Sequence, residues 1–240
     1  MSSALNVSAM DAVILCGGLG TRLQSVLKDK PKPMAEINDR PFLELLIAYV
    51  ANFGFRRFIL CAGHKGDFIK EYFQGKKSDN TYILSQETAP LGTAGAIKNA
   101  EPVITSETFL AMNGDSFCDV DLKSLVEFHF TKKALASVAL APMDDAKDYG
   151  GVALGEGDAI VRFDEKADVP ATGWVNAGIY IFNKKVLESI PAGKKVSLEE
   201  EVFPSLVGRG LFGFATSGQL LDIGTPERLE LARKLLTKVN

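Results

Sequence analysis

The chain has 240 residues, of which 46% are hydrophobic and 24% charged, and its formal net charge is −3. A chain of this length can bury roughly 70–75% of the surface that its unfolded form exposes, which is enough for an enzyme-sized core. The 27 basic and 30 acidic residues form no long basic run, which argues against nucleic acid as the main partner. No signal-peptide pattern and no run of about 18 apolar residues occurs, so we expect no membrane partner.

The three cysteines, Cys16, Cys61 and Cys118, lie in or beside apolar runs and share no CxxC spacing. This pattern favours buried free thiols over ligands or disulfides. We therefore expect a reducing compartment and a cytoplasmic location. His64 and His129 share no spacing with carboxylates that indicates a catalytic pair or a zinc site, and we expect structural or surface roles for both.

Apolar periodicity predicts alternating strands and helices over about the first 140 residues. Strands are expected at 10–16, 58–62, 81–84, 108–112 and 135–141, and helices at 42–52, 65–73, 93–100 and 122–132. This alternation is typical of a parallel sheet with helices on both faces.

Beyond residue 142 the turn signals lie closer together, which indicates a strand-rich insertion. Strands are expected at 151–154, 159–164, 174–182 and 211–215, and helices at 197–207 and 226–236. The predicted fold class is α/β, with a Rossmann-like, mixed and mainly parallel sheet. No change in composition marks a boundary, so we expect residues 1–240 to form a single domain with halves at about 10–141 and 142–240.

A glycine-rich loop, LCGGLGTRL at residues 15–23, follows the first predicted strand. It lacks the Lys-Ser or Lys-Thr pair of a Walker loop, and Leu23 stands where a dinucleotide fingerprint needs its last glycine. Glycines let backbone N–H groups approach phosphate oxygens, while an arginine adds a fixed positive fork. The candidate nucleotide-binding residues of this loop are Leu15, Gly17, Gly18, Gly20, Thr21 and Arg22.

Ten residues beyond Arg22, Lys32 lies in KPKPM, where prolines restrict the backbone on both sides. A lysine held in this way can reach the same phosphates, although a solvated lysine in a proline turn is the structural alternative.

Two aspartates follow predicted strands. Asn113, Gly114 and Asp115 come directly after the strand ending at 112, and Asp222 lies in LLDIGTPE. Open α/β sheets bind ligands at the carboxyl ends of their strands. For Asp115, in an Asn-Gly-Asp sequence, a cap of a helix or turn is an equally typical role.

The combination of GGLGTRL and PKPM resembles the signature of the sugar-1-phosphate nucleotidyltransferases, and the resemblance extends through nearly the whole chain. These enzymes join a nucleoside triphosphate to a sugar 1-phosphate and release pyrophosphate, and the product is a nucleotide sugar of the kind used for cell-surface polysaccharides. The resemblance implies catalytic roles for Arg22, Lys32, Asp115 and Asp222, with Mg²⁺ held by the two aspartates. It also implies a nucleotide-binding first half and a sugar-binding second half.

The segment ETAPLGTAGA, residues 87–96, is most similar to the guanylyltransferase branch of the family. In the family, the turn matching Gly92 and Thr93 receives the base, and the residue at the position of Glu87 reads the base edge. An ionised carboxylate accepts hydrogen bonds from the adjacent N1–H and N2–H₂ donors of guanine, whereas uracil and thymine present carbonyl oxygens. We therefore expect GTP, with UTP, CTP or dTTP as alternatives, and an exposed loop glutamate is the structural alternative for Glu87.

The candidate sugar-binding residues come from three segments of the sequence. DYGGVAL resembles the glycine-bearing strand that lies over the sugar and contributes Gly151. DEKAD resembles the family's EKP motif, with Ala167 in place of proline, and implies that Glu165 accepts from sugar hydroxyls and Lys166 holds the sugar phosphate. The amide of Asn176 in WVNAGIYIF can donate and accept at a sugar diol. The sequence is most similar to enzymes that use D-glycero-α-D-manno-heptose 1-phosphate, and next to mannose-1-phosphate guanylyltransferases.

Two other classes of protein remain open. A nucleotide-dependent oxidoreductase needs an acid about 20 residues beyond the glycine loop, and Asp39 lies near that distance but directly before Arg40-Pro41. A non-catalytic regulator that binds a sugar nucleotide has little need for both aspartates of the metal site. The sequence does not decide the oligomeric state, and a homo-oligomer stays open.

Overall fold

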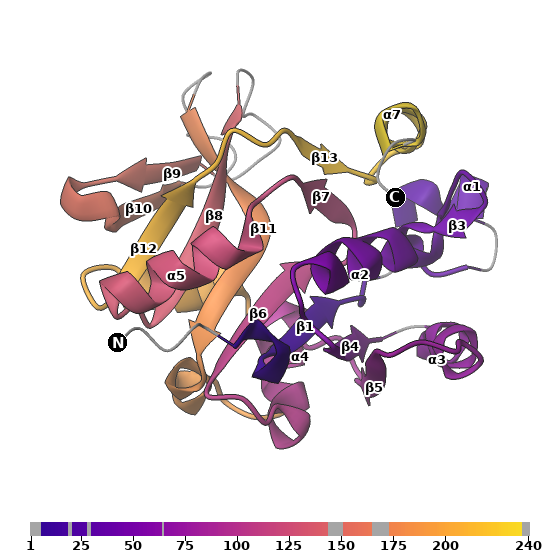
Figure 1. The fold of residues 1–240 in the computed structure, drawn as a ribbon, viewed down its shortest axis with the longest axis horizontal. Coiled ribbons are helices and arrows are strands. Elements are labelled where there is room, and N and C mark those ends of the chain that lie inside the picture. The colour runs from indigo at the N-terminus through magenta and orange to yellow at the C-terminus, as the bar shows by residue number, and fades with distance from the viewer. Residues whose placement is uncertain are drawn as a thin grey trace.

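The computed structural model describes residues 6–18, 21–27, 30–63, 65–143, 151–164 and 173–236. Within these residues the central feature is a nine-stranded sheet, whose main path runs β10-β9-β11-β6-β1-β4-β5, with β8 paired to β11 and β12 to β8 (Figure 1). Its strands are β1 (Asp11–Leu15), β4 (Arg57–Ala62), β5 (Thr81–Gln86), β6 (Thr108–Asn113), β8 (Ala136–Met143), β9 (Gly151–Leu154), β10 (Ile160–Asp164), β11 (Gly173–Asn183) and β12 (Leu211–Ala215).

Helices cover both faces of this sheet. The α-helices in the described residues are α1 (Gln24–Leu27), α2 (Phe42–Asn52), α3 (Gly66–Gln74), α4 (Gly92–Ala100), α5 (Leu122–Lys132), α6 (Phe203–Leu206) and α7 (Pro226–Leu235). Short 3-10 helices are η1 (Val7–Ala9), η2 (Thr21–Leu23), η3 (Lys32–Met34), η4 (Glu101–Val103), η5 (Glu156–Asp158) and η6 (Lys184–Ser189), and η7 (Leu198–Val202) is a π-helix.

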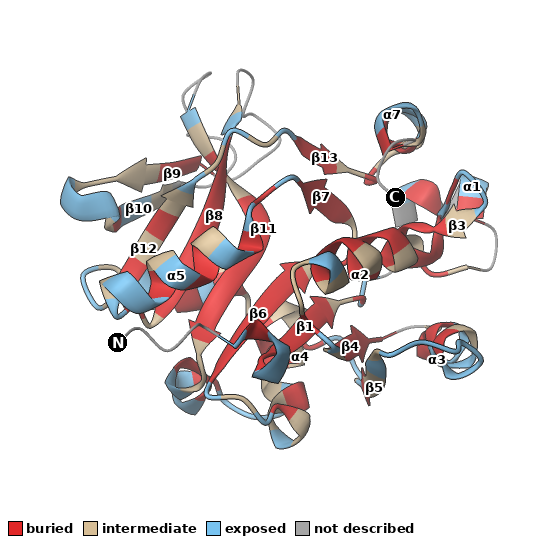
Figure 2. Ribbon diagram, in the orientation of Figure 1, coloured by how far each residue is buried: buried red, intermediate tan, exposed pale blue. Residues whose placement is uncertain are grey.

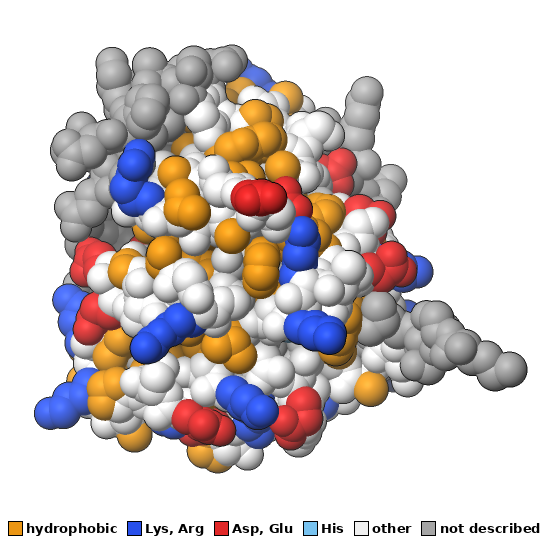
Figure 3. Space-filling view, turned by 90° about the vertical axis from the view of Figure 1, so that its left-hand side faces the viewer, with side chains coloured by type: hydrophobic (Ala, Val, Ile, Leu, Met, Phe, Trp, Pro, Cys, Tyr) orange, Lys and Arg blue, Asp and Glu red, His pale blue; other side chains and the backbone are white. Residues whose placement is uncertain are grey.

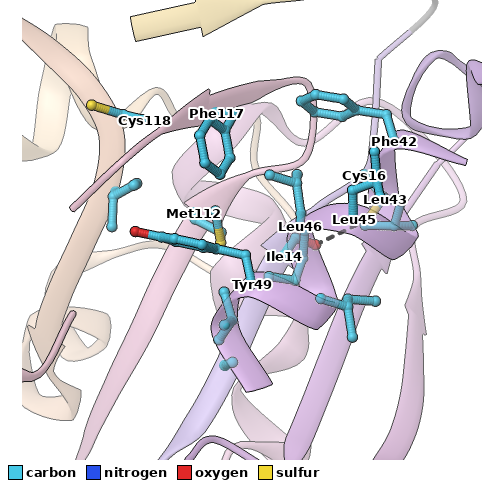
Figure 4. Packing of buried hydrophobic residues seen from close by; sticks show 14 of the residues in the cluster. Ile14, Cys16, Phe42, Leu43, Leu45, Leu46, Tyr49, Met112, Phe117 and Cys118 are labelled. Carbon is cyan, nitrogen blue, oxygen red and sulfur yellow. Dashed lines mark hydrogen bonds between the residues drawn. The ribbon is translucent and has the colours of Figure 1, made fainter. Parts of the chain in front are cut away.

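The strands of the first half are apolar on both faces because each face supports its own core. Successive β1 residues point to opposite sides, so Ala12 and Ile14 belong to one core and Val13 to the other. Figure 2 shows the strands buried between the helices. In the first core, Leu46 and Tyr49 of α2 pack near Ile14 (Figure 4), and α4 lies over the other face.

The sheet is parallel in its first half and mixed in its second. β5, β4, β1 and β6 pair in parallel, but β11 is antiparallel to β6, β8 and β9. The sequence predicts the strand of β8 as a continuation of the parallel series, and the structure corrects this prediction. Because the eleven-residue β11 lies between β6 and β8, β8 makes its only parallel pairing among the described strands with β12.

Three features are absent from the sequence prediction. Two small antiparallel sheets form, one from β2 (Glu36–Ile37) and β3 (Arg40–Pro41), the other from β7 (Ser116–Cys118) and β13 (Leu220–Asp222). The single helix expected at 197–207 is instead η7 followed by α6. Pro204 explains this break, since it has no N–H to continue the hydrogen-bond ladder of a regular helix.

The surface carries mixed side chains. The face toward the left of Figure 1, which bears β9, β10 and β12, intersperses hydrophobic, basic and acidic side chains and shows no uniformly basic patch (Figure 3). Among the described residues, no helix is both long and apolar enough to span a bilayer.

Candidate active site

The glycine loop leaves the sheet at the carboxyl ends of three neighbouring strands. Leu15 is in register with Cys61 of β4 and Asn113 of β6, and the Gly114 amide donates to the Leu15 carbonyl at 2.9 Å. A Cβ at Gly114 would lie 2.7 Å from that carbonyl oxygen, so only glycine permits this close approach. The loop therefore begins directly beside the turn that carries Asp115.

The loop itself exposes Gly17, Gly18 and Arg22 to solvent. Gly18 has a φ of +114°, a conformation that side chains with a Cβ rarely adopt. Gly20 and the side chain of Thr21 lie outside the described residues. Exposed backbone beside an arginine at the carboxyl edge of a parallel sheet is an arrangement that suits an anionic ligand.

Asp115 and Asp222 lie side by side because β13 pairs with β7. Asp222 is in register with Ser116, and the Ile223 amide donates to the Asp115 carbonyl at 3.0 Å. The apolar residues Leu220 and Leu221 hold β13 against β7. Two aspartates that are 107 positions apart in the sequence are thereby neighbours in space.

Lys32 reaches the same place. Its ammonium lies 2.6 Å from Asp115 Oδ2, and η3, with Pro31 preceding it and Pro33 within it, fixes the backbone from which it extends. The Gly224 amide donates to Asp222 Oδ1 at 2.7 Å, and Arg228 donates to Asp222 Oδ2 at 3.0 Å. Asp222 thus accepts a hydrogen bond within its own turn and also forms an ion pair.

This donor set fits Mg²⁺. Among the described residues no group of three or more His, Cys, Asp or Glu side chains is placed to hold a metal, so the candidates are the two aspartates alone. Mg²⁺ is typically bound through one or two carboxylates and completes its octahedron with substrate phosphates and water. The side chain of Asp115 is 41% exposed, which leaves room for such outer ligands.

Glu87 lies against the glycine loop. The residue follows β5, its amide donates to the Ala62 carbonyl at 2.9 Å, and its Oε2 accepts from the Leu91 amide at 3.3 Å. A Cβ at Gly63 would lie 2.5 Å from Glu87 Oε1, and one at Gly17 would lie 3.4 Å away. The carboxylate therefore occupies space left by two glycines, and its burial raises the pKa of Glu87 above the usual value. It is half-buried and not an exposed loop glutamate.

The small residues of the turn expected to receive the base also allow close packing within the chain. Gly92 opens α4 with a φ of +71°, and a Cβ there would lie 2.5 Å from the Val196 carbonyl oxygen. The amides of Ala94 and Gly95 donate to that same oxygen at 3.0 and 3.2 Å. The glycines thus let the chain's own 194–196 segment pack against the start of α4.

A hydrogen-bonded network connects this turn to Asn176. Thr93 Oγ1 donates to Glu199 Oε2 at 3.0 Å, and the Tyr180 hydroxyl lies 3.4 Å from Glu199 Oε1. Asn176 Nδ2 donates to the Tyr180 hydroxyl at 2.9 Å, while Asn176 Oδ1 accepts from the Gly178 amide at 2.9 Å. Burial, reinforced by the nearby Glu199 carboxylate, raises the pKa of Tyr180 well above its usual value.

Three residues of this region escape sequence analysis. Glu199 belongs to a run of three glutamates after Ser197 and resembles an ordinary acidic first turn of a helix. Tyr180 reads as a core residue, which it is, but its hydroxyl belongs to the network. Gly63 is part of no motif, and only its distance to Glu87 reveals its role.

On the sugar side, the described residues include Gly151 and Asn176. Gly151 is buried at the start of β9 and is in register with Asp164 and Val175. Glu165, Lys166 and the start of the DYGGVAL segment lie outside the described residues. So does His64.

The cysteines and His129 offer no nucleophile or metal ligand. All three cysteines are buried and free, as predicted, and burial raises the pKa of Cys61 and of Cys118 to about 12. His129 is buried with Nδ1 3.0 Å from Ser137 Oγ, and desolvation lowers its pKa to about 4. Its role is structural, as expected.

Comparison with known proteins decides the family. Residues 11–239 match the family described as Nucleotidyl transferase. The chain belongs to this family. The nucleotidyltransferase is 39% identical over 221 residues to D-glycero-alpha-D-manno-heptose 1-phosphate guanylyltransferase of Campylobacter jejuni, covering 91% of this chain and 96% of that protein. It is 36% identical over 228 residues to the protein of the same name from Aneurinibacillus thermoaerophilus, covering 95% and 98%.

A solved structure agrees with these relatives. HddC from Yersinia pseudotuberculosis, complexed with GMP-PN, superimposes with a TM-score of 0.81 at 34% identity, covering 94% of this chain and 98% of that chain. Family membership confirms the resemblance, the α/β fold with a mixed sheet and the enzyme class, and it excludes the oxidoreductase alternative.

Proposed function

We propose that this nucleotidyltransferase transfers GMP from GTP to D-glycero-α-D-manno-heptose 1-phosphate, releasing pyrophosphate and forming a GDP-sugar. The names of the relatives and the GMP-PN complex of HddC support the nucleotide and the sugar. The observation that carries the reaction is the contact of Lys32 with Asp115, beside Asp222, at the carboxyl ends of the strands and next to the glycine loop.

The chemistry needs alignment and charge neutralisation more than a general base. A phosphate monoester with a second pKa near 6 is mostly a dianion at neutral pH, so the sugar phosphate is already nucleophilic. We assign Arg22 and the loop N–H groups of Gly17, Gly18 and Gly20 to the departing pyrophosphate. We assign Lys32 to the α-phosphate and the attacking oxygen, whose charge it would neutralise during in-line displacement.

Asp115 and Asp222 are the proposed Mg²⁺ ligands. When bound, the ion supplies positive charge that neutralises phosphate oxygens. The two aspartates would hold the ion at the edge of the sheet. The ion pair of Asp115 with Lys32 keeps the Lys32 ammonium beside them. Backbone pairing holds this end of the sheet together next to the aspartates. It joins Leu15 to Asn113 and to Gly114.

The base is assigned to Glu87 with the turn at Gly92 and Thr93. A carboxylate beside the glycine loop accepts from the two adjacent donors of guanine and from no such pair in uracil or thymine. The amide of Leu91 holds one carboxylate oxygen in place, which limits the rotation of the side chain.

The sugar is assigned to Gly151, Asn176, Glu165 and Lys166. The Asn176 amide is oriented by Gly178 and Tyr180, and an amide with two donors and two lone pairs keeps one of each for a sugar diol. Glu199 orients this group through Tyr180. Three buried free thiols suit a reducing compartment, which supports the cytoplasm as the place of the reaction. The use that we propose for the product is nucleotide-sugar supply for cell-surface polysaccharide.

The test is pyrophosphate release with Mg²⁺, crossing GTP, ATP, CTP and UTP with the heptose 1-phosphate, mannose 1-phosphate and glucose 1-phosphate. We expect the highest kcat/KM for GTP with the heptose. GTP with mannose would keep the mechanism and overturn the sugar, and another nucleotide would overturn the role of Glu87. No release in any combination would favour a regulator that binds a sugar nucleotide.

A further inference from the structure

Arg228 occupies a helix position that normally favours the opposite charge. Thr225 caps α7 and accepts from the Arg228 amide at 3.3 Å, so Arg228 is the third residue of the helix. A capping box places glutamate or glutamine at this position, and the helix dipole disfavours a cation in the first turn. An arginine here calls for a stabilising contact outside the helix.

That contact is with a proposed metal ligand. Arg228 NH1 donates to Asp222 Oδ2 at 3.0 Å, while Asp222 Oδ1 accepts from the Gly224 amide. The Asp222 side chain is only 14% exposed and that of Arg228 is 29% exposed. Each carboxylate oxygen of Asp222 thus has a donor from the chain itself, and one of these donors carries a full positive charge.

A second ion pair lies directly beside the first. Lys32 Nζ is 2.6 Å from Asp115 Oδ2 and 3.7 Å from where a Cβ of Gly224 would lie. Since Gly224 also donates to Asp222, both aspartates and both cations form one contiguous cluster. The chain thus pairs each proposed metal ligand with one of its own basic residues.

We propose that Arg228 is a positioning residue that couples metal binding to nucleotide binding. This inference rests on the proposed function, in which Asp115 and Asp222 hold the divalent metal. A guanidinium on Asp222 repels an incoming dication, so the metal binds weakly to the enzyme alone. A bound triphosphate adds several negative charges that attract both the Arg228 guanidinium and the divalent metal. The same guanidinium therefore favours nucleotide binding, and in the nucleotide complex its repulsion no longer weakens metal binding.

The test measures two affinities that this role moves in opposite directions. Mn²⁺ alone is titrated into the nucleotide-free enzyme and the free ion is followed by electron paramagnetic resonance. Binding of a fluorescent GTP derivative is measured separately in EDTA. For Arg228→Gln we expect Mn²⁺ to bind roughly tenfold tighter and the GTP derivative several-fold weaker, with Arg228→Lys close to the original chain.

Two controls separate this role from a general change in charge or folding. Arg233→Gln removes the same charge from the same helix at a residue that pairs with Glu230, and we expect it to leave both affinities unchanged. In an Asp222→Asn background, Arg228→Gln should no longer tighten Mn²⁺ binding, because the contact through which it acts is gone. Thermal melting checks that each variant is folded.

The outcomes distinguish this inference from the proposed function. Mn²⁺ binding by the original chain that Asp222→Asn weakens, together with an unchanged or weaker affinity in Arg228→Gln, would overturn the role of Arg228 and keep the metal site. Two affinities that move in the same direction would also overturn it. If neither the original chain nor Arg228→Gln binds Mn²⁺, both the metal site and this inference fail.

Discussion

At the scale of single residues, the surroundings of Glu87 suit its proposed role in reading the base. Burial opposes its ionisation and raises its pKa, while the Leu91 amide partly offsets this effect. The group lies in space that Gly17 and Gly63 leave open. A partly buried carboxylate with an unsatisfied oxygen costs free energy, and the paired donors of guanine would remove that cost.

We expect Glu87→Gln to lower kcat/KM for GTP by about 10- to 100-fold, because an amide replaces one acceptor by a donor that faces a guanine donor. The kcat/KM for UTP should stay the same or rise. Steady-state pyrophosphate release with each nucleotide measures both values. Glu127→Gln, at an exposed position of α5, is the matched control, and an unchanged ratio of GTP to UTP in Glu87→Gln would contradict the role of Glu87.

His129 makes the stability of the fold depend on pH. Its pKa falls from 6.5 to about 4 on folding because the ring is buried, so the folded protein binds fewer protons than the unfolded chain between these values. The free energy of unfolding should therefore decrease as the pH is lowered, by about 2 kcal/mol from this group between pH 7.5 and pH 5.

Urea denaturation at the two pH values tests this effect, with His129→Gln as the comparison because it keeps a polar partner for Ser137. The variant should lose less stability on acidification than the original chain by roughly that amount. An equal loss in both proteins would show that His129 does not contribute.

At the scale of elements, the start of α4 depends on a glycine for two separate reasons. Gly92 and Gly157 both have positive φ, at +71° and +65°. A Cβ at Gly92 would meet the Val196 carbonyl, whereas nothing lies within 4 Å of one at Gly157. Backbone strain is common to the two positions, and the collision belongs to Gly92 alone.

We expect Gly157→Ala to lower the free energy of unfolding by about 1 kcal/mol, the cost of the left-handed conformation. Gly92→Ala should cost about 3 kcal/mol or more, because the 194–196 segment must also move. Urea denaturation gives both values. Equal costs would mean that the packing of this segment against α4 contributes nothing.

The elements that sequence predicts well are those with a strong local pattern. The parallel strands β1, β4 and β6 are apolar and buried in their centres because both faces are covered, and the helices between the strands show clear periodicity. The three-residue strands β7 and β13 are too short to show a period, and their pairing joins segments about 100 residues apart. The interruption at Pro204 turns one predicted helix into two short pieces.

The same limit applies to the candidate site. Lys32, Asp115 and Glu87 belong to motifs that a resemblance identifies in sequence. Glu199 belongs to a run of glutamates, and its contact with Thr93 arises only when distant segments meet. Arg228 belongs to no motif, and only its contact with Asp222 shows its role. Sequence motifs thus predict the motif residues themselves. The side chains that contact and orient these residues are known only from the folded structure.

At the scale of the whole molecule, one sheet joins the two halves of the chain. β11 pairs with β6 of the first half and with β8 and β9, and the two apolar cores lie on opposite faces of this sheet. β13 then returns from near the end of the chain to place Asp222 beside Asp115. The proposed reaction centre therefore exists only when the entire fold is formed.

The most direct test of this account is the turnover number for GTP and the heptose 1-phosphate in Asp222→Asn, with Asp158→Asn as the control. Asp158 is an exposed aspartate that pairs with Lys132 and has no proposed role in the site. We predict that kcat falls by about 10³-fold in Asp222→Asn, because the proposed metal loses a charged ligand. Melting temperature should stay close to that of the original chain, and Asp158→Asn should keep full activity. A folded Asp222→Asn enzyme that turns over within threefold of the original rate, a difference of about 0.7 kcal/mol, would contradict the central claim.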